Sequence, residues 1–407
     1  MKFSRYNICH RRGDSVIVLN TLSGSIISFD KSFFCLLSKG KVIPRELKPQ
    51  LIANKILAND DIEFKKIVRK RKCSNTSCSR TASVTLYTTL DCNFRCSYCF
   101  QVHKSSIMDA QTVEAVKDYL CRLNIIYDEI SITWIGGEPL LTLDVIEDIS
   151  RHLQSKHVNF KAKIITNGFW LNESMMRRLH KCNIASIQVT FDGMPSTHNN
   201  KRRSHESTET FDIILNNVSY ALHNFSDISF NIYINIDSDN IHEFIPLHKY
   251  ISSFLKEGNY MIIPNFIENF SQTQCNNVVS DNDRFNFLVD LHDKHAIKAV
   301  DFAIEYEPTA CMACNANSIA VAYNGDIYKC TTLVGNTKYV VGNIKNKLPL
   351  ANLPTYSFAK TVRERCLSCP YFPLCDGGCP LLNNRLKCKI MHESVTRALI
   401  AAVDGFE

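Results

Sequence analysis

Segments typical of strands alternate with segments typical of amphipathic helices from Val84 to about Val300. We expect strands at residues 84–90, 130–135, 161–166, 184–192, 228–236 and 259–267. Helical patterns fall between them, at Thr112 to Leu123, Leu143 to Leu153, Glu173 to His180, Phe211 to Leu222 and Ile241 to Leu255. Because a crossover helix returns the chain to a parallel neighbour, this pattern predicts an α/β fold with a parallel sheet. Six such units predict a partial (β/α)6, TIM-like barrel with ligands at the carboxyl ends of its strands.

Regions of a different character flank this core, and 407 residues are too many for one small core. Residues 1–65 combine alternating apolar segments with helical patterns and predict a small α+β domain. The basic, Ser-rich segment 66–83 predicts a linker, and residues 84–305 make up the expected core. Residues 306–407 make up the expected C-terminal domain, in which helical periodicity fades from Ala310 to Lys389. A small, loop-rich domain of this kind needs additional stabilisation, which bound metal can supply.

The chain contains 18 cysteines, and three of them stand in the stretch CNFRCSYCF, with the spacing Cys92-x3-Cys96-x2-Cys99. This stretch directly follows the expected strand 84–90. No apolar run approaches the ~18 residues of a membrane span, and the N-terminus lacks the apolar region of a signal peptide. We therefore expect a cytoplasmic protein, in which clustered thiols are metal ligands rather than disulfides.

The number of clustered cysteines indicates one open and two closed metal sites. Thiolates suit Zn²⁺ or iron–sulfur clusters, and a closed site takes four of them. Three cysteines therefore leave one position open for a substrate or cofactor. Eight more follow in the C-terminal region: Cys311, Cys314, Cys330, Cys366, Cys369, Cys375, Cys379 and Cys388. At this point two structural zinc ions in a cysteine-rich scaffold, without enzyme activity, remain an alternative.

The stretch CNFRCSYCF resembles the signature of radical S-adenosylmethionine (SAM) enzymes, which has an aromatic residue before the third cysteine. The C-terminal cysteines, together with Gly325, resemble the SPASM auxiliary-cluster pattern, so the chain is similar to radical SAM/SPASM enzymes over about residues 84–390. The resemblance implies that Cys92, Cys96 and Cys99 hold a [4Fe–4S] cluster whose fourth iron binds SAM. It also implies two auxiliary [4Fe–4S] clusters, the first on Cys311, Cys314, Cys330 and Cys379 and the second on Cys366, Cys369, Cys375 and Cys388.

The resemblance also implies a set of SAM contacts at the ends of successive strands. The turn Gly136, Gly137, Glu138, Pro139 follows strand 130–135 and would hold the SAM amino group. Its glycines permit close backbone approach, and the Glu138 carboxylate can pair with an ammonium group. The remaining implied contacts are Tyr98 at the adenine, Asn167, Thr190 and Asp192 near the ribose and carboxylate, and Arg202, with Arg203 as an alternative, at the carboxylate.

The function that the resemblance implies is that of a peptide maturase, most like the maturases of ribosomally made (RiPP) peptides. A 5′-deoxyadenosyl radical would abstract hydrogen from a precursor peptide, and a carbon–carbon or thioether cross-link would follow. Residues 1–65 resemble winged-helix-like peptide-recognition domains, which add an extended leader peptide to a sheet edge; a purely structural cap is the alternative. The implied electron donor is of flavodoxin or ferredoxin type. We expect no nucleic-acid or membrane partner, since the net charge of +7 is slight.

Two other reactions remain open at this level. One is the oxidation of Ser or Cys to formylglycine by anaerobic sulfatase maturases. Those enzymes characteristically have an Asp after the cysteine that corresponds to Cys330, whereas this chain has Thr331. The other is epimerisation, for which Cys182 or Cys275 could donate a hydrogen atom. No catalytic base is indicated by the sequence.

Overall fold

A computed structural model describes residues 1–41, 43–73, 80–101, 103–269, 277–300, 302, 304, 311–346, 356, 362–375, 377–379, 381–382 and 385–404. The chain divides into two compact units. Unit 1 comprises Met1–Asn75, Ser280–Cys311 and Ser357–Glu407, and unit 2 comprises Thr76–Val279 and Met312–Tyr356. The cysteine-rich C-terminal region is thus shared between the units. Within the described residues, we find no helix with the length and apolarity that a membrane span requires.

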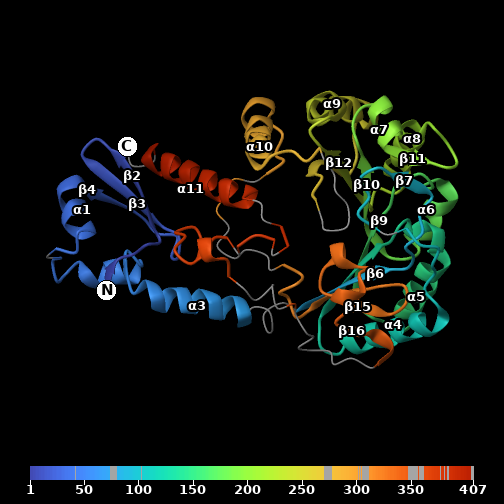
Figure 1. Cartoon of the computed structure of the whole chain (residues 1–407), viewed down its shortest axis with the longest axis horizontal. Coiled ribbons are helices and arrows are strands. Elements are labelled where there is room, and N and C mark those ends of the chain that lie inside the picture. Colours follow the sequence, from blue (N-terminus) through green and yellow to red (C-terminus); the bar gives the residue numbers. More distant parts are fainter. Residues whose placement is uncertain are drawn as a thin grey trace. The chain divides into compact units, whose positions relative to one another are not determined.

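Unit 2 is built on a nine-stranded mixed sheet with the order β13-β12-β10-β9-β8-β6-β14-β15-β16 (Figure 1). The first six strands of this order run parallel to one another, and their bounds are β6 Thr81–Tyr87, β8 Glu129–Ile135, β9 Phe160–Ile165, β10 Ile184–Phe191, β12 Ser229–Ile236 and β13 Tyr260–Phe266. The six strands expected from the sequence are therefore confirmed. The largest shift in bounds is at the first strand, which begins and ends three residues earlier than expected.

Helices connect these strands in the expected alternation. Their bounds are α4 Ala110–Leu123, α5 Leu143–Ser155, α6 Glu173–His180, α7 Pro195–Lys201, α8 Thr210–Asn224 and α9 Phe244–Leu255. The helices cover one face of the sheet, as strand β8 illustrates: Ile130, Ile132 and Trp134 are fully buried, whereas Ser131 and Thr133 between them are half-buried. The second face of the sheet is thus more polar and more accessible. The predicted site residues lie at the carboxyl ends of its strands.

Three short strands from the C-terminal region extend this sheet beyond β6. They are β14 Ser318–Val321, β15 Asp326–Tyr328 and β16 Gly342–Asn343. Strand β14 pairs with β6 in parallel, while β15 and β16 add in antiparallel orientation. The sequence did not indicate them, because strands of two to four residues are too short for a periodic pattern. The hydroxyl of Tyr87 at the end of β6 donates to the Thr331 carbonyl at 2.9 Å, which ties this extension to the edge of the predicted site.

Unit 1 contains a three-stranded antiparallel sheet in the order β2-β3-β4. Its elements are β1 Lys2–Phe3, β2 Asn7–Arg12, β3 Ser15–Asn20, β4 Ile26–Asp30, α1 Lys31–Ser38, α2 Lys48–Ala53, β5 Leu57–Ala58, α3 Asp60–Cys73, α10 Asp281–His295 and α11 Leu386–Asp404. The Asp30 carboxylate caps α1 by accepting from the Ser32 amide at 2.8 Å. Helix α3 continues through the first part of the expected linker 66–83.

The central strand β3 is buried on both faces. Val16 and Val18 pack with Phe29, Phe34 and Leu37 from the following strand and helix. On the opposite face, Ile17 and Leu19 pack with C-terminal residues, which are Leu374, Cys375, Met391, Val395 and Leu399. The cysteine-rich segment after residue 362 is therefore folded against the N-terminal sheet within one hydrophobic core.

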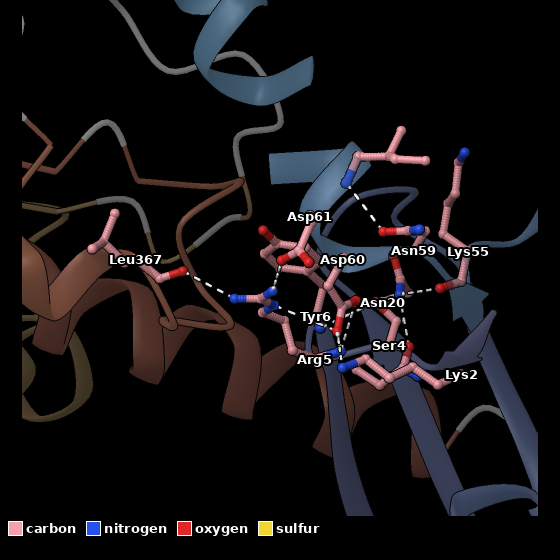
Figure 2. Close-up of polar contacts among 12 residues, drawn as sticks. Lys2, Ser4, Arg5, Tyr6, Asn20, Lys55, Asn59, Asp60, Asp61 and Leu367 are labelled. Carbon is pink, nitrogen blue, oxygen red and sulfur yellow. Dashed lines mark hydrogen bonds and ion pairs between the residues drawn. The ribbon is translucent and has the colours of Figure 1, made fainter. Parts of the chain in front are cut away.

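A buried aspartate fastens the start of the chain to this segment (Figure 2). Asp60 is 3% exposed and accepts hydrogen bonds from the Ser4 hydroxyl at 3.0 Å and the Arg5 amide at 3.2 Å. The Arg5 guanidinium lies 3.4 Å from the Asp60 carboxylate and also donates to the Leu367 carbonyl at 3.1 Å. Because Leu367 stands between Cys366 and Cys369, the N-terminal residues help to hold this cysteine loop in place.

Candidate active site

The three-cysteine loop begins directly after β6 and is held by a short antiparallel ribbon. Strand β7, Phe94–Cys96, pairs with β11, Arg202–Ser204, so that Cys96 lies opposite Arg202. The Phe94 side chain, 1% exposed, anchors the loop in the core, and the Arg202 guanidinium lies 5.6 Å from its ring centroid. The sequence placed these two segments about a hundred residues apart, and the ribbon brings them together.

The Gly-Gly-Glu-Pro turn packs directly against the main chain that leads into this loop. The Gly137 amide donates to the Thr89 carbonyl at 3.2 Å, and the Glu138 amide donates to the Asp91 carbonyl at 2.8 Å. A Cβ atom on Gly136 would lie 2.4 Å from the Thr89 oxygen, and one on Gly137 would lie 2.0 Å from the Asp91 oxygen. Both positions therefore require glycine because the two main chains approach so closely.

Glu138 is 1% exposed and is the acceptor at the centre of the turn. Its carboxylate accepts hydrogen bonds from the Leu140 amide at 3.0 Å, the Thr166 hydroxyl at 2.7 Å and the Asn167 amide at 2.8 Å. Burial raises the pKa of Glu138 to about 7 in spite of these donors. The Asn167 side chain donates in turn to Asn93 in the cysteine loop at 2.7 Å, so the ends of β8 and β9 meet at the loop.

A second group of polar side chains lies at the ends of β10 and β12. The Arg202 guanidinium donates to the Tyr98 hydroxyl at 2.8 Å and lies 3.7 Å from Asp192. The Asn235 amide also donates to the Tyr98 hydroxyl, at 3.0 Å. Burial raises the pKa of Asp192, while Arg202 favours its charged form. Arg203 is exposed and donates to the Asn200 carbonyl at 3.1 Å, so Arg202 is the arginine of this group.

Several residues near this group were not indicated by the sequence. Fully buried His198 accepts from the Asp192 amide at 3.3 Å through Nδ1. Burial holds the pKa of His198 well below its usual value, so the ring remains neutral. Asn93, Asn235 and His198 are polar residues without a spacing rule, and only their position beside the site distinguishes them. Predicted residue Thr190 is half-buried on β10, two positions before Asp192.

Burial disfavours the charged form of the three thiols. It raises the pKa of Cys92 to about 12, that of Cys96 to about 11, and that of Cys99 in the same direction. The Phe94 amide donates to the Cys92 sulfur at 3.3 Å. Thiolates at such positions need a bound cation, and iron supplies the positive charge in iron–sulfur proteins.

The residues present fit a [4Fe–4S] cluster with bound SAM. Both carboxylate oxygens of Asp192 and the Nε atom of Arg202 are buried. Within the described residues, none of these three atoms makes a hydrogen bond of standard geometry. Buried charged groups of this kind suit the carboxylate and ammonium of a ligand. No three described His, Cys, Asp or Glu side chains converge closely enough for a single metal ion. Cys92, Cys96 and Cys99 would instead hold an iron–sulfur cluster, for which thiolates are the usual ligands.

The four cysteines predicted for the second auxiliary cluster lie in one neighbourhood of unit 1. Cys366 and Cys375 are buried, whereas Cys369 and Cys388 are partly buried. A hydrogen bond with Cys375 lowers the pKa of Cys388, against the opposing effect of Cys366 and Cys369. The pKa of Cys369 is raised by burial, and the thiols of Cys366 and Cys375 add to this.

The four cysteines predicted for the first auxiliary cluster fall on both units. Cys314 and Cys330 belong to unit 2 and flank the β14–β15 hairpin, whose turn contains Gly325 with a φ of +89°. The spacing Cys314-x10-Gly325-x4-Cys330 therefore describes a hairpin that returns the chain to its starting end. Cys311 and Cys379 belong to unit 1, so this ligand set stays a prediction.

The structure describes one of the two cysteines that could donate a hydrogen atom for epimerisation, Cys182, and not the other, Cys275. Cys182 is 2% exposed and lies before the first residue of β10, whereas Asp192 follows the last residue of that strand. Cys182 therefore stands at the edge of the sheet opposite to the site. Cys275, like Cys78 and the side chain of Cys73, lies outside the described residues.

Comparison with known proteins finds a family match within the core of unit 2. Residues 86–251 match the radical SAM superfamily. The chain is 25% identical to a cysteine-type anaerobic sulfatase-maturating enzyme of Clostridium perfringens over 325 residues, which cover 71% of this chain and 85% of the relative. It is 26% identical to an uncharacterised protein of Methanocaldococcus jannaschii over 266 residues, covering 64% of this chain and 88% of that protein.

Solved structures of the same architecture include two peptide complexes. The complex of anSMEcpe with AdoMet and the Cp18Cys peptide has a TM-score of 0.64 at 21% identity and covers 80% of this chain and 100% of its own. Streptococcus suis SuiB bound to the precursor peptide SuiA has a TM-score of 0.56 at 16% identity and covers 93% and 95%. These likenesses show the fold, and the family match spans the cysteine loop and the Gly-Gly-Glu-Pro turn. Residues 86–251 are therefore a radical SAM domain, and members of this superfamily are oxidoreductase enzymes.

Proposed function

We propose that this chain is a radical SAM peptide maturase that cross-links a ribosomally made precursor peptide. The observation that carries the proposal is the buried group of Glu138, Asp192 and Arg202 around the three sulfurs of Cys92, Cys96 and Cys99. Burying charged groups is costly, and a cluster of such groups with perturbed pKa values marks a candidate functional site. We also propose that the six parallel strands of unit 2 and their helices form a partial (β/α)6 barrel.

Each side chain of the group has a defined task toward SAM. Glu138 would pair with the ammonium and Arg202 with the carboxylate, each as a charge-assisted hydrogen bond. Asn167, Thr190 and Asp192 stand at the ends of neighbouring strands and would lie near the ribose and carboxylate, while Tyr98 would lie against the adenine. A bound, reduced cluster on Cys92, Cys96 and Cys99 would supply the electron for reductive cleavage of SAM, which would initiate hydrogen abstraction from the peptide. The protein meanwhile orients the substrate and excludes water.

We assign residues 306–407 as a SPASM region with two auxiliary [4Fe–4S] clusters. The proximity of Cys366, Cys369, Cys375 and Cys388 supports the second cluster. The first would take Cys311, Cys314, Cys330 and Cys379. These clusters would accept the electron that remains when a substrate radical forms a new bond. A low-potential electron donor of flavodoxin or ferredoxin type would reduce the SAM-binding cluster.

We assign the three-stranded sheet of residues 1–65 as the surface that captures the leader of the precursor peptide. Strands β2 and β4 are its two edges, and an extended peptide can add to such an edge through main-chain hydrogen bonds. Strand β2 ends in His10, Arg11 and Arg12, which would favour an acidic leader. The fold of SuiB covers 93% of this chain, against 80% for anSMEcpe, so the SuiB architecture extends further over the flanking regions.

Formylglycine formation is the second candidate, because the sulfatase-maturase relative of C. perfringens matches over 85% of its length. The residue after Cys330 is Thr331, whose carbonyl accepts from Tyr87. A hydroxyl side chain at this position cannot act as the carboxylate base that the maturases carry there. We therefore favour a cross-link over formylglycine.

Anaerobic reconstitution tests the cofactor assignment. We expect a brown protein with roughly 12 iron atoms per chain, as three cubane clusters require, and release of 5′-deoxyadenosine from SAM under reducing conditions. Cys92→Ala should abolish that release and keep about two thirds of the iron. A colourless protein that binds only zinc contradicts the proposal and supports the scaffold alternative.

Mass spectrometry tests the reaction. A short open reading frame beside the gene would be the candidate precursor, and the encoded peptide would be co-expressed with the enzyme. A cross-link removes two hydrogen atoms and leaves no aldehyde, whereas formylglycine reacts with hydrazides. Epimerisation leaves the mass unchanged, so either of the latter results would replace the cross-linking assignment.

A further inference from the structure

A histidine that the proposed function does not use stands beside the third cysteine of the loop. His103 Nε2 lies 3.3 Å from the Cys99 sulfur, and the ring is half-buried. The other hydrogen bonds to these sulfurs that we find in the described residues come from main-chain amides, such as that of Phe94 to Cys92 and that of Gln101 to Cys99. Main-chain donors follow from the loop conformation, whereas the His103 contact depends on one side chain.

The main chain around His103 is held against residues 88–90, which follow strand β6. The Lys104 amide donates to the Leu90 carbonyl at 3.3 Å. Two residues later, the Ser106 hydroxyl accepts from the Leu90 amide at 2.9 Å, and the Ser106 carbonyl accepts from the Thr89 hydroxyl at 2.5 Å. The segment therefore returns antiparallel to residues 88–90, and this path places the imidazole over Cys99.

The chemistry of a cluster ligand decides which way the hydrogen bond runs. A thiolate sulfur bound to iron carries no proton and can only accept, so the donor is Nε2–H of His103. Nδ1 of the same ring is buried and makes no hydrogen bond to any described residue. A proton on Nδ1 would thus have no protein acceptor, which favours the tautomer with the proton on Nε2.

We propose that His103 donates a hydrogen bond to the Cys99 sulfur and makes the SAM-binding cluster easier to reduce. Reduction transfers one electron from a low-potential donor to the cluster and increases the negative charge on its sulfur ligands. An N–H dipole directed at sulfur stabilises that added charge more than it stabilises the oxidised state. His103 acts through Cys99 and is a positioning residue; the inference rests on the cluster assignment of the proposed function.

The test is an EPR-monitored redox titration of the reconstituted full-length enzyme, following the signal that changes when SAM is added. His103→Leu should shift the midpoint potential of this signal to more negative values. His103→Gln, which keeps an N–H donor, should restore part of the shift. The matched control is His152→Leu, because His152 Nε2 contacts a cysteine outside the predicted clusters, Cys121, at 3.7 Å. This control should keep the wild-type potential.

A second measurement uses the wild type and does not depend on the stability of a variant. Pulsed EPR of protein labelled with ¹⁵N-histidine should show coupling of the reduced cluster to a histidine nitrogen, and His103→Gln should remove it. Wild-type protein with a normal SAM-sensitive signal but no such coupling, or a His103→Leu variant with unchanged potential, overturns the inference alone. Failure of the wild type to give any SAM-sensitive signal overturns the cluster assignment and the inference together.

Discussion

Glu138 is expected to make the stability of the cofactor-free protein fall as the pH rises. Burial raises its pKa from the ordinary 4.5 to about 7. Below pH 4.5 the carboxyl group is protonated in both the folded and the unfolded chain, and its contribution to stability is complete. Between pH 4.5 and 7 the unfolded chain releases the proton while the folded chain retains it, so the free energy of unfolding decreases. The pKa difference of about 2.5 corresponds to about 3 kcal/mol.

The measurement is thermal unfolding of protein free of cluster and SAM, with Glu138→Gln as the matched variant. The amide of glutamine would bring its own N–H groups toward the Asn167 amide, which lowers the stability of the variant by an amount independent of pH. Only the difference between the two curves across pH 4.5–8 therefore reports the titration. For a unit of this size, about 3 kcal/mol shifts the unfolding temperature by roughly 6–12 °C.

The reasoning predicts a sign as well as a size. The unfolding temperature of the wild type should fall relative to that of Glu138→Gln as the pH rises through this window. Bound SAM should reduce the fall, since its ammonium favours the ionised carboxylate. If the difference between the two unfolding temperatures stays constant with pH, Glu138 holds no proton in the folded state. If the wild type instead gains stability relative to Glu138→Gln as the pH rises, the pKa of Glu138 is lowered and burial is not the dominant effect.

Three further substitutions test other parts of the structure. Gly137→Ala places a Cβ 2.0 Å from the Asp91 oxygen and displaces the cysteine loop by about 1 Å, so 5′-deoxyadenosine formation should fall by about 100-fold while circular dichroism stays unchanged. Gly325→Ala forces an alanine into a φ of +89° and should cost about 1–2 kcal/mol, seen as a lower unfolding temperature with SAM cleavage retained. Cys388→Ala should remove about four iron atoms of roughly twelve and leave SAM cleavage intact. Unchanged iron content would contradict the ligand assignment of the second auxiliary cluster.

Signals that depend on neighbouring residues could be predicted from the sequence. The six parallel strands and their connecting helices follow from a local hydrophobic period, and the structure confirms them. The cysteine loop and the Gly-Gly-Glu-Pro turn follow from spacing, because both place their groups at the end of a single strand. Their positions at the carboxyl edge of the sheet are a consequence of parallel topology, which the alternation of strands and helices already implies.

Contacts between residues remote in sequence were decided only by the tertiary structure. Arg202 reaches Tyr98 and Asp192 through a ribbon that no local pattern indicates, and its choice over Arg203 depends on which side chain faces inward. The cysteine-rich region is shared between the units because β14 adds to the edge of β6 while residues after 362 pack on β3. Sheet edges accept any strand of suitable length, and hydrophobic cores accept any side chains that fill them. The sequence therefore determined the elements and the reactive groups, whereas packing determined which of them meet.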